Sequence, residues 1–134
     1  MISSSNILRA LSDDKTSVIF HTVALGNISD AATMAAKLGI TRRQYYSRLA
    51  KITNADLVRK ETKGKYHLTS LGEVVYGSLL TIDKALKNYW ALKLVESCRI
   101  NSSLSTDGEI PKLIDALIND KHVKGFLAEI IVPK

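Results

Sequence analysis

Residues 30–72 read DAATMAAKLGITRRQYYSRLAKITNADLVRKETKGKYHLTSLG. An alanine-rich helix comes first, and Gly39 makes the turn that ends it. Thr41 and Gln44 then have the spacing of a capping box, in which the threonine hydroxyl accepts from the N3 amide and the glutamine reaches back. We therefore expect a second helix from residue 41 to about residue 54.

Two short segments follow this second helix. Residues 57–62 and 65–69 are bounded by turn-forming residues and are separated by Lys63 and Gly64. This pattern predicts a β-hairpin that turns at Lys63-Gly64. Because a two-stranded hairpin alone is only marginally stable, we expect it to pack against the helices.

The positive charge of the chain is concentrated in the same region. Residues 42–65 hold eight Lys or Arg side chains against Asp56 and Glu61, which gives +6, equal to the net charge of the whole protein. The other residues balance 11 basic against 11 acidic side chains. A pI of about 9.5 suits a polyanionic partner such as nucleic acid or an anionic membrane surface.

Length and composition limit the possible classes of protein. The 134 residues, 46% of them hydrophobic, predict one domain or one domain with a helical appendage. The single cysteine, Cys98, excludes an internal disulfide framework and favours a reducing, cytoplasmic location. No stretch approaches the roughly 20 apolar residues of a membrane span, and we see no secretory signal, so no membrane partner is expected.

The second helix of the quoted stretch has two chemically different sides. Placed on a helical wheel, Tyr45, Leu49 and Ile52 cluster into a buried stripe. The opposite side presents Arg, Gln, Ser and Tyr, which are side chains able to read base edges in a major groove. The alternative is an ordinary solvated face, which we would favour for an isolated charged helix.

The order of elements favours a base-reading face over an ordinary solvated face. It resembles a winged helix-turn-helix, and most closely the small archaeal winged-helix regulators in the same broad group as MarR- and ArsR-like repressors. The resemblance covers about residues 13–76. The matching positions are residues 34–41, Tyr45, Leu49, Ile52, residues 57–60, the wing at residues 63–66, and residues 68–72.

The resemblance implies a sequence-specific regulator of transcription that binds double-stranded DNA, with helix 41–54 in the major groove and wing 63–65 on the flanking backbone. The residues it assigns to base or phosphate contact are Arg42, Arg43, Gln44, Tyr46 and Ser47, with Arg48 and Lys51 on the backbone and Lys63 and Lys65 in the wing. A partly buried aromatic is an equally good interpretation of Tyr46. Asp56 departs from the glycine usual at its position, where a left-handed backbone is needed.

The rest of the chain is predicted to be helical, so the fold class is mainly α with a small β-hairpin. We expect a helix at residues 1–12 and a stronger one from Asp13 or Asp14, whose buried stripe is Val18, Ile19, Phe20 and Val23. The winged domain would span residues 1–76 and a helical dimerisation region residues 77–134. That region has one long helix from residue 70 to about residue 100, a loop at residues 101–108 and two short helices within residues 109–132.

The long helix carries an apolar seam too long for one small domain to cover. Val75, Leu79, Ile82, Leu86 and Tyr89 follow the 4-3-4-3 spacing of a coiled coil, and Trp90 broadens the surface. We predict a homodimer that holds two recognition helices about 34 Å apart, matching successive major grooves. The alternative is that the two final helices fold back and cover the seam within one chain.

No pattern for catalysis is present in the sequence. His21, His67 and His122 are far apart, so no metal site is expected, and we find no phosphate-binding glycine loop and no nucleophile–base pair. We therefore expect neither an enzyme nor a cofactor. Two other functions stay open: a winged-helix protein-interaction module docking onto transcription machinery, and a ligand-gated regulator with a pocket between the long helix and the tail.

Overall fold

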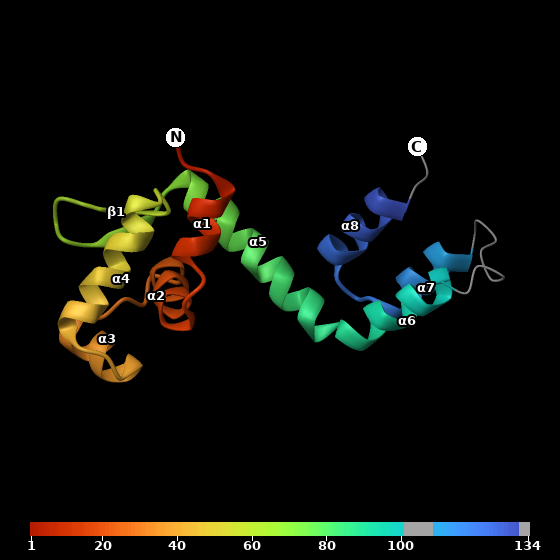
Figure 1. The fold of residues 1–134 in the computed structure, drawn as a ribbon, viewed down its shortest axis with the longest axis horizontal. Helices are drawn as coiled ribbons and strands as arrows, with labels where there is room; N and C mark the ends of the chain where they lie inside the picture. Colours follow the sequence, from red (N-terminus) through yellow and green to blue (C-terminus); the bar gives the residue numbers. More distant parts are fainter. Residues whose placement is uncertain (101–108, 132–134) are drawn as a thin grey trace. The chain divides into compact units, whose positions relative to one another are not determined.

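The computed structural model describes residues 1–100 and 109–131, and these are mainly helical (Figure 1). They form eight helices and one two-stranded antiparallel hairpin, as the sequence predicts for the fold class. The chain divides into two compact units, Met1–Gly77 and Ser78–Lys134. Each unit is described by itself below.

The first unit contains four helices, the hairpin and the start of a fifth helix. Its elements are α1 (Ser4–Ala10), α2 (Asp14–Ala24), α3 (Ala31–Leu38), α4 (Arg42–Asn54), β1 (Val58–Lys60), β2 (Tyr66–Leu68) and the first turns of α5 (Ser70–Lys87). Its most buried apolar side chains come from α2, α3, α4 and the entry of the hairpin: Ile19, Phe20, Val23, Met34, Ala35, Tyr45, Leu49, Ile52, Leu57 and Val58.

Helix α1 is shorter than the predicted residues 1–12, and its N-terminus is better capped than the sequence indicates. The hydroxyl of Ser3 accepts from the Asn6 amide at 3.2 Å, and Asn6 Oδ1 accepts from the Ser3 amide at 2.9 Å. This is a capping box with Asn where Glu or Gln is usual.

In helix α2, the prediction that Val18 is buried is wrong. Val18 is 48% exposed, whereas Thr16 is fully buried together with Ile19, Phe20 and Val23. Positions 16, 19, 20 and 23 repeat at the spacing of one helix face, and Val18 lies off it. Asp13 caps the helix by accepting from the Thr16 amide, and the threonine hydroxyl donates to the same carboxylate, which removes the cost of burying it.

Helix α4 has the boundaries and the buried side that the sequence predicts. Gly39 adopts the left-handed conformation (φ 67°) that ends α3, and the Thr41–Gln44 capping box starts α4. Tyr45, Leu49 and Ile52 are all buried. The opposite side of α4 is therefore left to solvent.

The hairpin turns where the glycine predicts. Val58 pairs with Leu68 and Lys60 with Tyr66, and Gly64 (φ 82°) makes the turn. Asp56 has φ 61° and confirms the left-handed backbone expected there. The hydroxyl of Thr69 donates to the Asp56 carbonyl at 2.6 Å, which ties the entry of the hairpin to its exit.

The second unit contradicts the expectation of a single helix from residue 70 to about residue 100. Helix α5 ends at Lys87, and α6 (Tyr89–Ile100) begins after Asn88. The Asn88 amide is shared between the carbonyls of Lys84 and Ala85, and the Asn88 side chain also donates to the Lys84 carbonyl at 2.8 Å. Asparagine competes for backbone carbonyls in this way and so favours helix ends over helix interiors.

Two short helices pack against α6. They are α7 (Glu109–Leu117) and α8 (Lys121–Ile131), close to the two helices predicted within residues 109–132. A separate core forms from Val95, Ile114, Ile118 and Val123. The predicted loop at residues 101–108 lies outside the described residues.

Asp120 begins α8 and also ties it to α5. Its carboxylate accepts from the amides of His122 and Val123, and it pairs with Lys84 at 3.2 Å. These hydrogen bonds, and the neighbouring Lys84, lower the pKa of Asp120. In the part of the chain that the structure describes, no helix combines the length and the apolar character needed to cross a membrane.

Candidate nucleic-acid interface

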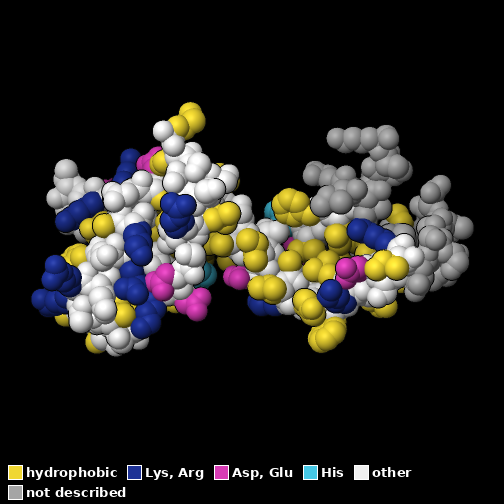
Figure 2. All heavy atoms as spheres, in the orientation of Figure 1, with side chains coloured by type: hydrophobic (Ala, Val, Ile, Leu, Met, Phe, Trp, Pro, Cys, Tyr) yellow, Lys and Arg dark blue, Asp and Glu magenta, His cyan; other side chains and the backbone are white. Residues whose placement is uncertain are grey.

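The solvent side of α4 presents six of the nine side chains predicted to contact DNA. These six are all exposed: Arg42, Arg43, Gln44, Tyr46, Ser47 and Lys51. They are held outward because the buried stripe of the same helix is packed into the core. Figure 2 shows Lys and Arg side chains spread over the unit that carries α4 and the hairpin.

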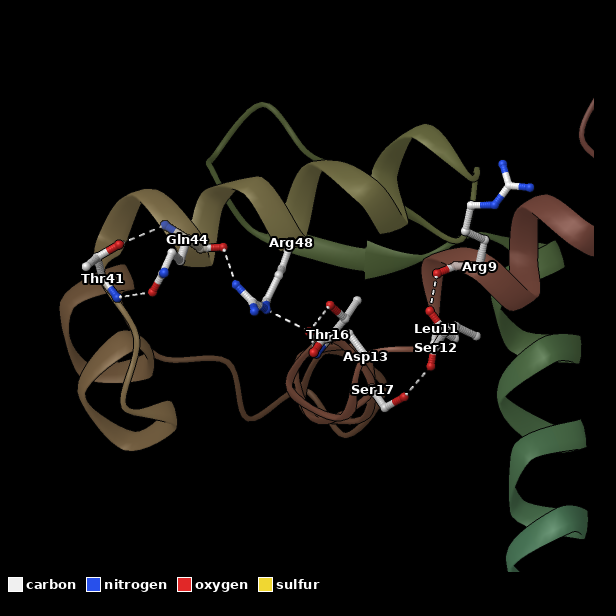
Figure 3. Close-up of polar contacts among 9 residues, drawn as sticks. All are labelled: Arg9, Leu11, Ser12, Asp13, Thr16, Ser17, Thr41, Gln44 and Arg48. Carbon is white, nitrogen blue, oxygen red and sulfur yellow. Dashed lines mark hydrogen bonds and ion pairs between the residues drawn. The ribbon is translucent and has the colours of Figure 1, made fainter.

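Gln44 is already engaged by its own helix. Its Oε1 accepts from the Thr41 amide at 3.0 Å, and the Gln44 amide donates to the Thr41 hydroxyl at 3.1 Å (Figure 3). A glutamine that pairs with adenine in bidentate fashion needs both its oxygen and its nitrogen. While the capping box is formed, Gln44 therefore has only its amide N–H groups to offer a base or a phosphate.

Arg48 is turned toward the protein itself. Its Nε donates to Asp13 Oδ2 at 2.7 Å, and its Nη1 donates to the Gln44 carbonyl at 3.4 Å (Figure 3). The Arg48 hydrogen bond, with those from Thr16, lowers the pKa of Asp13 from its ordinary value of 3.8 to about 2. The sequence pattern missed this ion pair because its partners are 35 residues apart, and no local spacing could indicate it.

Tyr46 is exposed, which favours its interpretation as a DNA contact over that as a partly buried aromatic. Its side chain is 55% exposed and meets Tyr45 edge to face, with the ring centroids 5.7 Å apart. Tyr45 is the buried member of the pair, and burial raises its pKa, with smaller contributions from Tyr66 and Tyr46. Tyr46 therefore offers its hydroxyl and one ring face to solvent.

The hairpin predicted to form the wing lies beside α4. A hollow of about 320 Å³ is lined by Tyr46 and Leu49 of α4 and by Lys65 and Tyr66 of the hairpin. Lys63 and Lys65 are both exposed. The structure thus brings one predicted contact from α4, Tyr46, and one from the hairpin, Lys65, to one hollow.

The hairpin carries its own polar contacts. His67 Nε2 lies 3.2 Å from Glu61 Oε2, across the two ends of the turn. The Lys60 ammonium lies 5.9 Å from the centre of the Tyr66 ring, within the range of a cation–π contact. These contacts fix the base of the wing and leave its tip at Lys63 and Lys65.

A larger hollow, of about 720 Å³, lies elsewhere in the first unit. It is lined by the C-terminal end of α2, by β2 and by Glu73 and Tyr76 of α5. Of the nine predicted DNA contacts only Lys65 borders it. This hollow is therefore not the pocket that was expected between the long helix and the tail.

The predicted dimerisation residues are arranged in two groups. Val75 and Leu79 are half-buried, whereas Ile82 (52%), Leu86 (64%), Tyr89 (45%) and Trp90 (80%) are exposed. Helices α7 and α8 pack instead on the face that contains Ala85, Ala91, Leu92 and Val95. Within the described residues, the fold-back alternative therefore leaves most of the seam uncovered.

The described residues include no group of three or more His, Cys, Asp or Glu side chains placed to hold a metal ion. Comparisons of the chain with protein-family models, with curated proteins and with solved structures found no match.

Proposed function

We propose that this chain is a homodimeric, sequence-specific regulator of transcription that binds double-stranded DNA through a winged helix-turn-helix. The observation that carries the proposal is the exposed face of α4 next to the wing, with Tyr46 and Lys65 on one hollow. Helix α3, Gly39 and α4 form the helix-turn-helix, and the hairpin forms the wing. The local excess of positive charge attracts a polyanion to this surface.

Helix α4 would enter the major groove with its N-terminal half. Arg43 has an exposed guanidinium, which can donate twice to guanine O6 and N7. Ser47 lies one turn further along the same side and is small enough to allow close approach to the bases. Lys63 and Lys65 would contact phosphates and thereby position the protein without reading sequence.

A second copy of the chain is the proposed partner of the exposed seam. Since α5 ends at Lys87, the coiled-coil spacing within one helix runs only from Val75 to Leu86. The dimer interface therefore needs the start of α6 as well, where Tyr89 and Trp90 meet edge to face at 5.2 Å. In the dimer, the two recognition helices would reach half-sites about 34 Å apart.

The test is a double variant, Arg42→Ala with Arg43→Ala, assayed on duplexes selected from randomised DNA by the wild-type protein. We expect a loss of affinity and a relaxed base preference at the positions that Arg43 reads. Lys87→Ala removes one positive charge from the exposed end of α5 and is the matched control. Wild-type affinity in the double variant would exclude α4 as the reading element.

The exposed apolar surface also supports a second candidate, a protein-interaction module without DNA readout. Leu86 and Trp90 are 64% and 80% exposed, a degree typical of residues that another molecule covers. Binding of a protein partner that does not weaken with salt, together with no retention on DNA at low salt, would favour this function over the first.

A further inference from the structure

We propose that helix α1 extends the DNA-binding surface, with Arg9 joining Lys51 and Asn54 in a clamp for a backbone phosphate. This inference rests on the proposed function and adds a contact that the sequence pattern does not assign. The three side chains come from two helices and line one hollow of about 590 Å³. They are called the α1–α4 clamp below.

The clamp exists because α1 packs against the C-terminal end of α4. Ala10 is 7% exposed and Ala55 is 6% exposed, and both line the hollow beside the three polar side chains. This packing brings Arg9, which is 42 positions before Lys51 in the sequence, to the end of the recognition helix. Local spacing could not have indicated this neighbour.

The chemistry of the clamp suits an anion. Arg9 and Lys51 are both exposed, and Asn54 adds an amide donor. Met1, Ile2, Asn6, Ala10 and Ala55 complete the lining, so no carboxylate lines the hollow. The Arg9 side chain extends away from the Asp13–Arg48 pair in Figure 3, and the described residues provide no ion-pair partner for it.

The position of the clamp along α4 points to the DNA backbone as the occupant. Arg43, Ser47 and Asn54 lie on one side of α4, and the path from Arg43 to Asn54 is about 16 Å long at 1.5 Å per residue. The major groove is about 12 Å wide. If α4 crosses the groove with Arg43 and Ser47 at the bases, its C-terminal end lies over the edge of the groove, where the phosphates are.

In the clamp, Arg9 takes the backbone-contacting role that was expected of Arg48. Arg48 was expected on the backbone, but its Nε is held by Asp13 at 2.7 Å. Arg9 places a guanidinium at the C-terminal end of α4, and no carboxylate lines the hollow there. Arginine suits this role because its planar group can donate two parallel hydrogen bonds to one phosphate.

The test compares the salt dependence of DNA binding for the wild type, Arg9→Ala, Arg9→Lys and Lys87→Ala. Each neutralised phosphate contributes about 0.9 to the slope of log Kd against log salt. We expect Arg9→Ala to lower this slope by up to about 0.9 per subunit, because Lys51 still contacts the same phosphate. We expect Arg9→Lys to keep most of the slope and Lys87→Ala to leave it unchanged, and thermal unfolding of each variant checks that it is folded.

Base preference separates the clamp from the reading face. Because a phosphate contact carries no sequence information, Arg9→Ala should select the same duplexes as the wild type. An unchanged slope in Arg9→Ala, while the Arg42 and Arg43 double variant loses affinity, would overturn the clamp and leave the proposed function standing. A wild-type protein that binds no duplex at low salt would overturn both.

Discussion

Asp13 links helices α2 and α4 through its carboxylate. Its carboxylate caps α2 through the Thr16 amide, satisfies the buried Thr16 hydroxyl and pairs with Arg48 of α4 at 2.7 Å. One side chain thus caps one helix and links it to another. The pair adds to the packing of Tyr45, Leu49 and Ile52, which directs Arg43 and Ser47 outward.

Replacing Asp13 with Asn should change how stability depends on pH. The folded pKa of Asp13 is about 2, lowered from 3.8, so the unfolded chain takes up the proton first as the pH falls. The stabilisation is complete above about pH 5 and is lost as the pH falls through about 2. We expect Asp13→Asn to be less stable at neutral pH and to lose less stability between pH 5 and pH 2, as measured by urea unfolding.

Asparagine is a suitable substitution because it caps helices about as well as aspartate, so mainly the charge is removed. Asp14→Asn removes a neighbouring carboxylate that is exposed and serves as the control. If Asp13→Asn and the wild type gave parallel profiles, the Asp13–Arg48 pair would have no part in acid stability.

At the scale of elements, the start of α5 packs closely against the entry of the hairpin. A Cβ added at Gly72 would overlap the Leu57 carbonyl oxygen and lie 3.3 Å from the Thr69 hydroxyl. The Gly72 amide donates to that hydroxyl at 2.9 Å. Glycine is required here for close approach, and its own backbone conformation is not the reason.

The pair of variants Gly72→Ala and Gly77→Ala tests this contact. Gly72→Ala forces the backbone apart and should destabilise the protein by about 1–3 kcal/mol, as overpacking typically does. A Cβ at Gly77 meets nothing within 4 Å, so alanine should stabilise the helix by about 0.5–1 kcal/mol. The free energy of unfolding in urea measures both, and equal effects would mean that α5 does not pack on Leu57 as described.

The helix break at Asn88 is an element-scale feature that local pattern did not indicate. Apolar residues continue on both sides of it, and the stretch contains no proline. The break follows from the way Asn88 engages the Lys84 carbonyl and from the packing of Ala85 and Val95 in the core of the second unit. Its consequence is that the seam passes from one helix to another between Leu86 and Tyr89.

At the scale of the whole molecule, the exposed seam predicts the assembly state. Ile82 and Leu86 lie one turn apart on α5 and are 52% and 64% exposed. We expect Ile82→Glu with Leu86→Glu to convert a dimer into a monomer, because two charges would be buried without partners at the interface. Sedimentation equilibrium measures the mass, and circular dichroism checks that the helices are kept.

Lys87→Glu, which places a glutamate on the same helix outside the seam, is the matched control and should remain a dimer. A wild-type protein that sediments as a monomer at micromolar concentration would remove the dimer from the proposed function. A double variant that sediments as a dimer would place the interface elsewhere.

The parts of the fold that the sequence predicted depend on neighbours within one or two turns. The Thr41–Gln44 capping box, the left-handed Gly39 and the turn at Gly64 are all short-range features. The stripe of Tyr45, Leu49 and Ile52 follows from helix period alone. For these features the chain needs no distant partner, so pattern was sufficient.

Contacts between distant residues were decided by the tertiary structure. The exposure of Val18, the Asp13–Arg48 pair, the hollow shared by Arg9 and Lys51 and the face of α6 chosen by α7 all depend on packing between elements. Several faces of a helix can be apolar or charged, and sequence spacing does not say which of them meets a neighbour. The basic helix and the hairpin were therefore determined by sequence, whereas the side chains that remain available for a ligand were determined by packing.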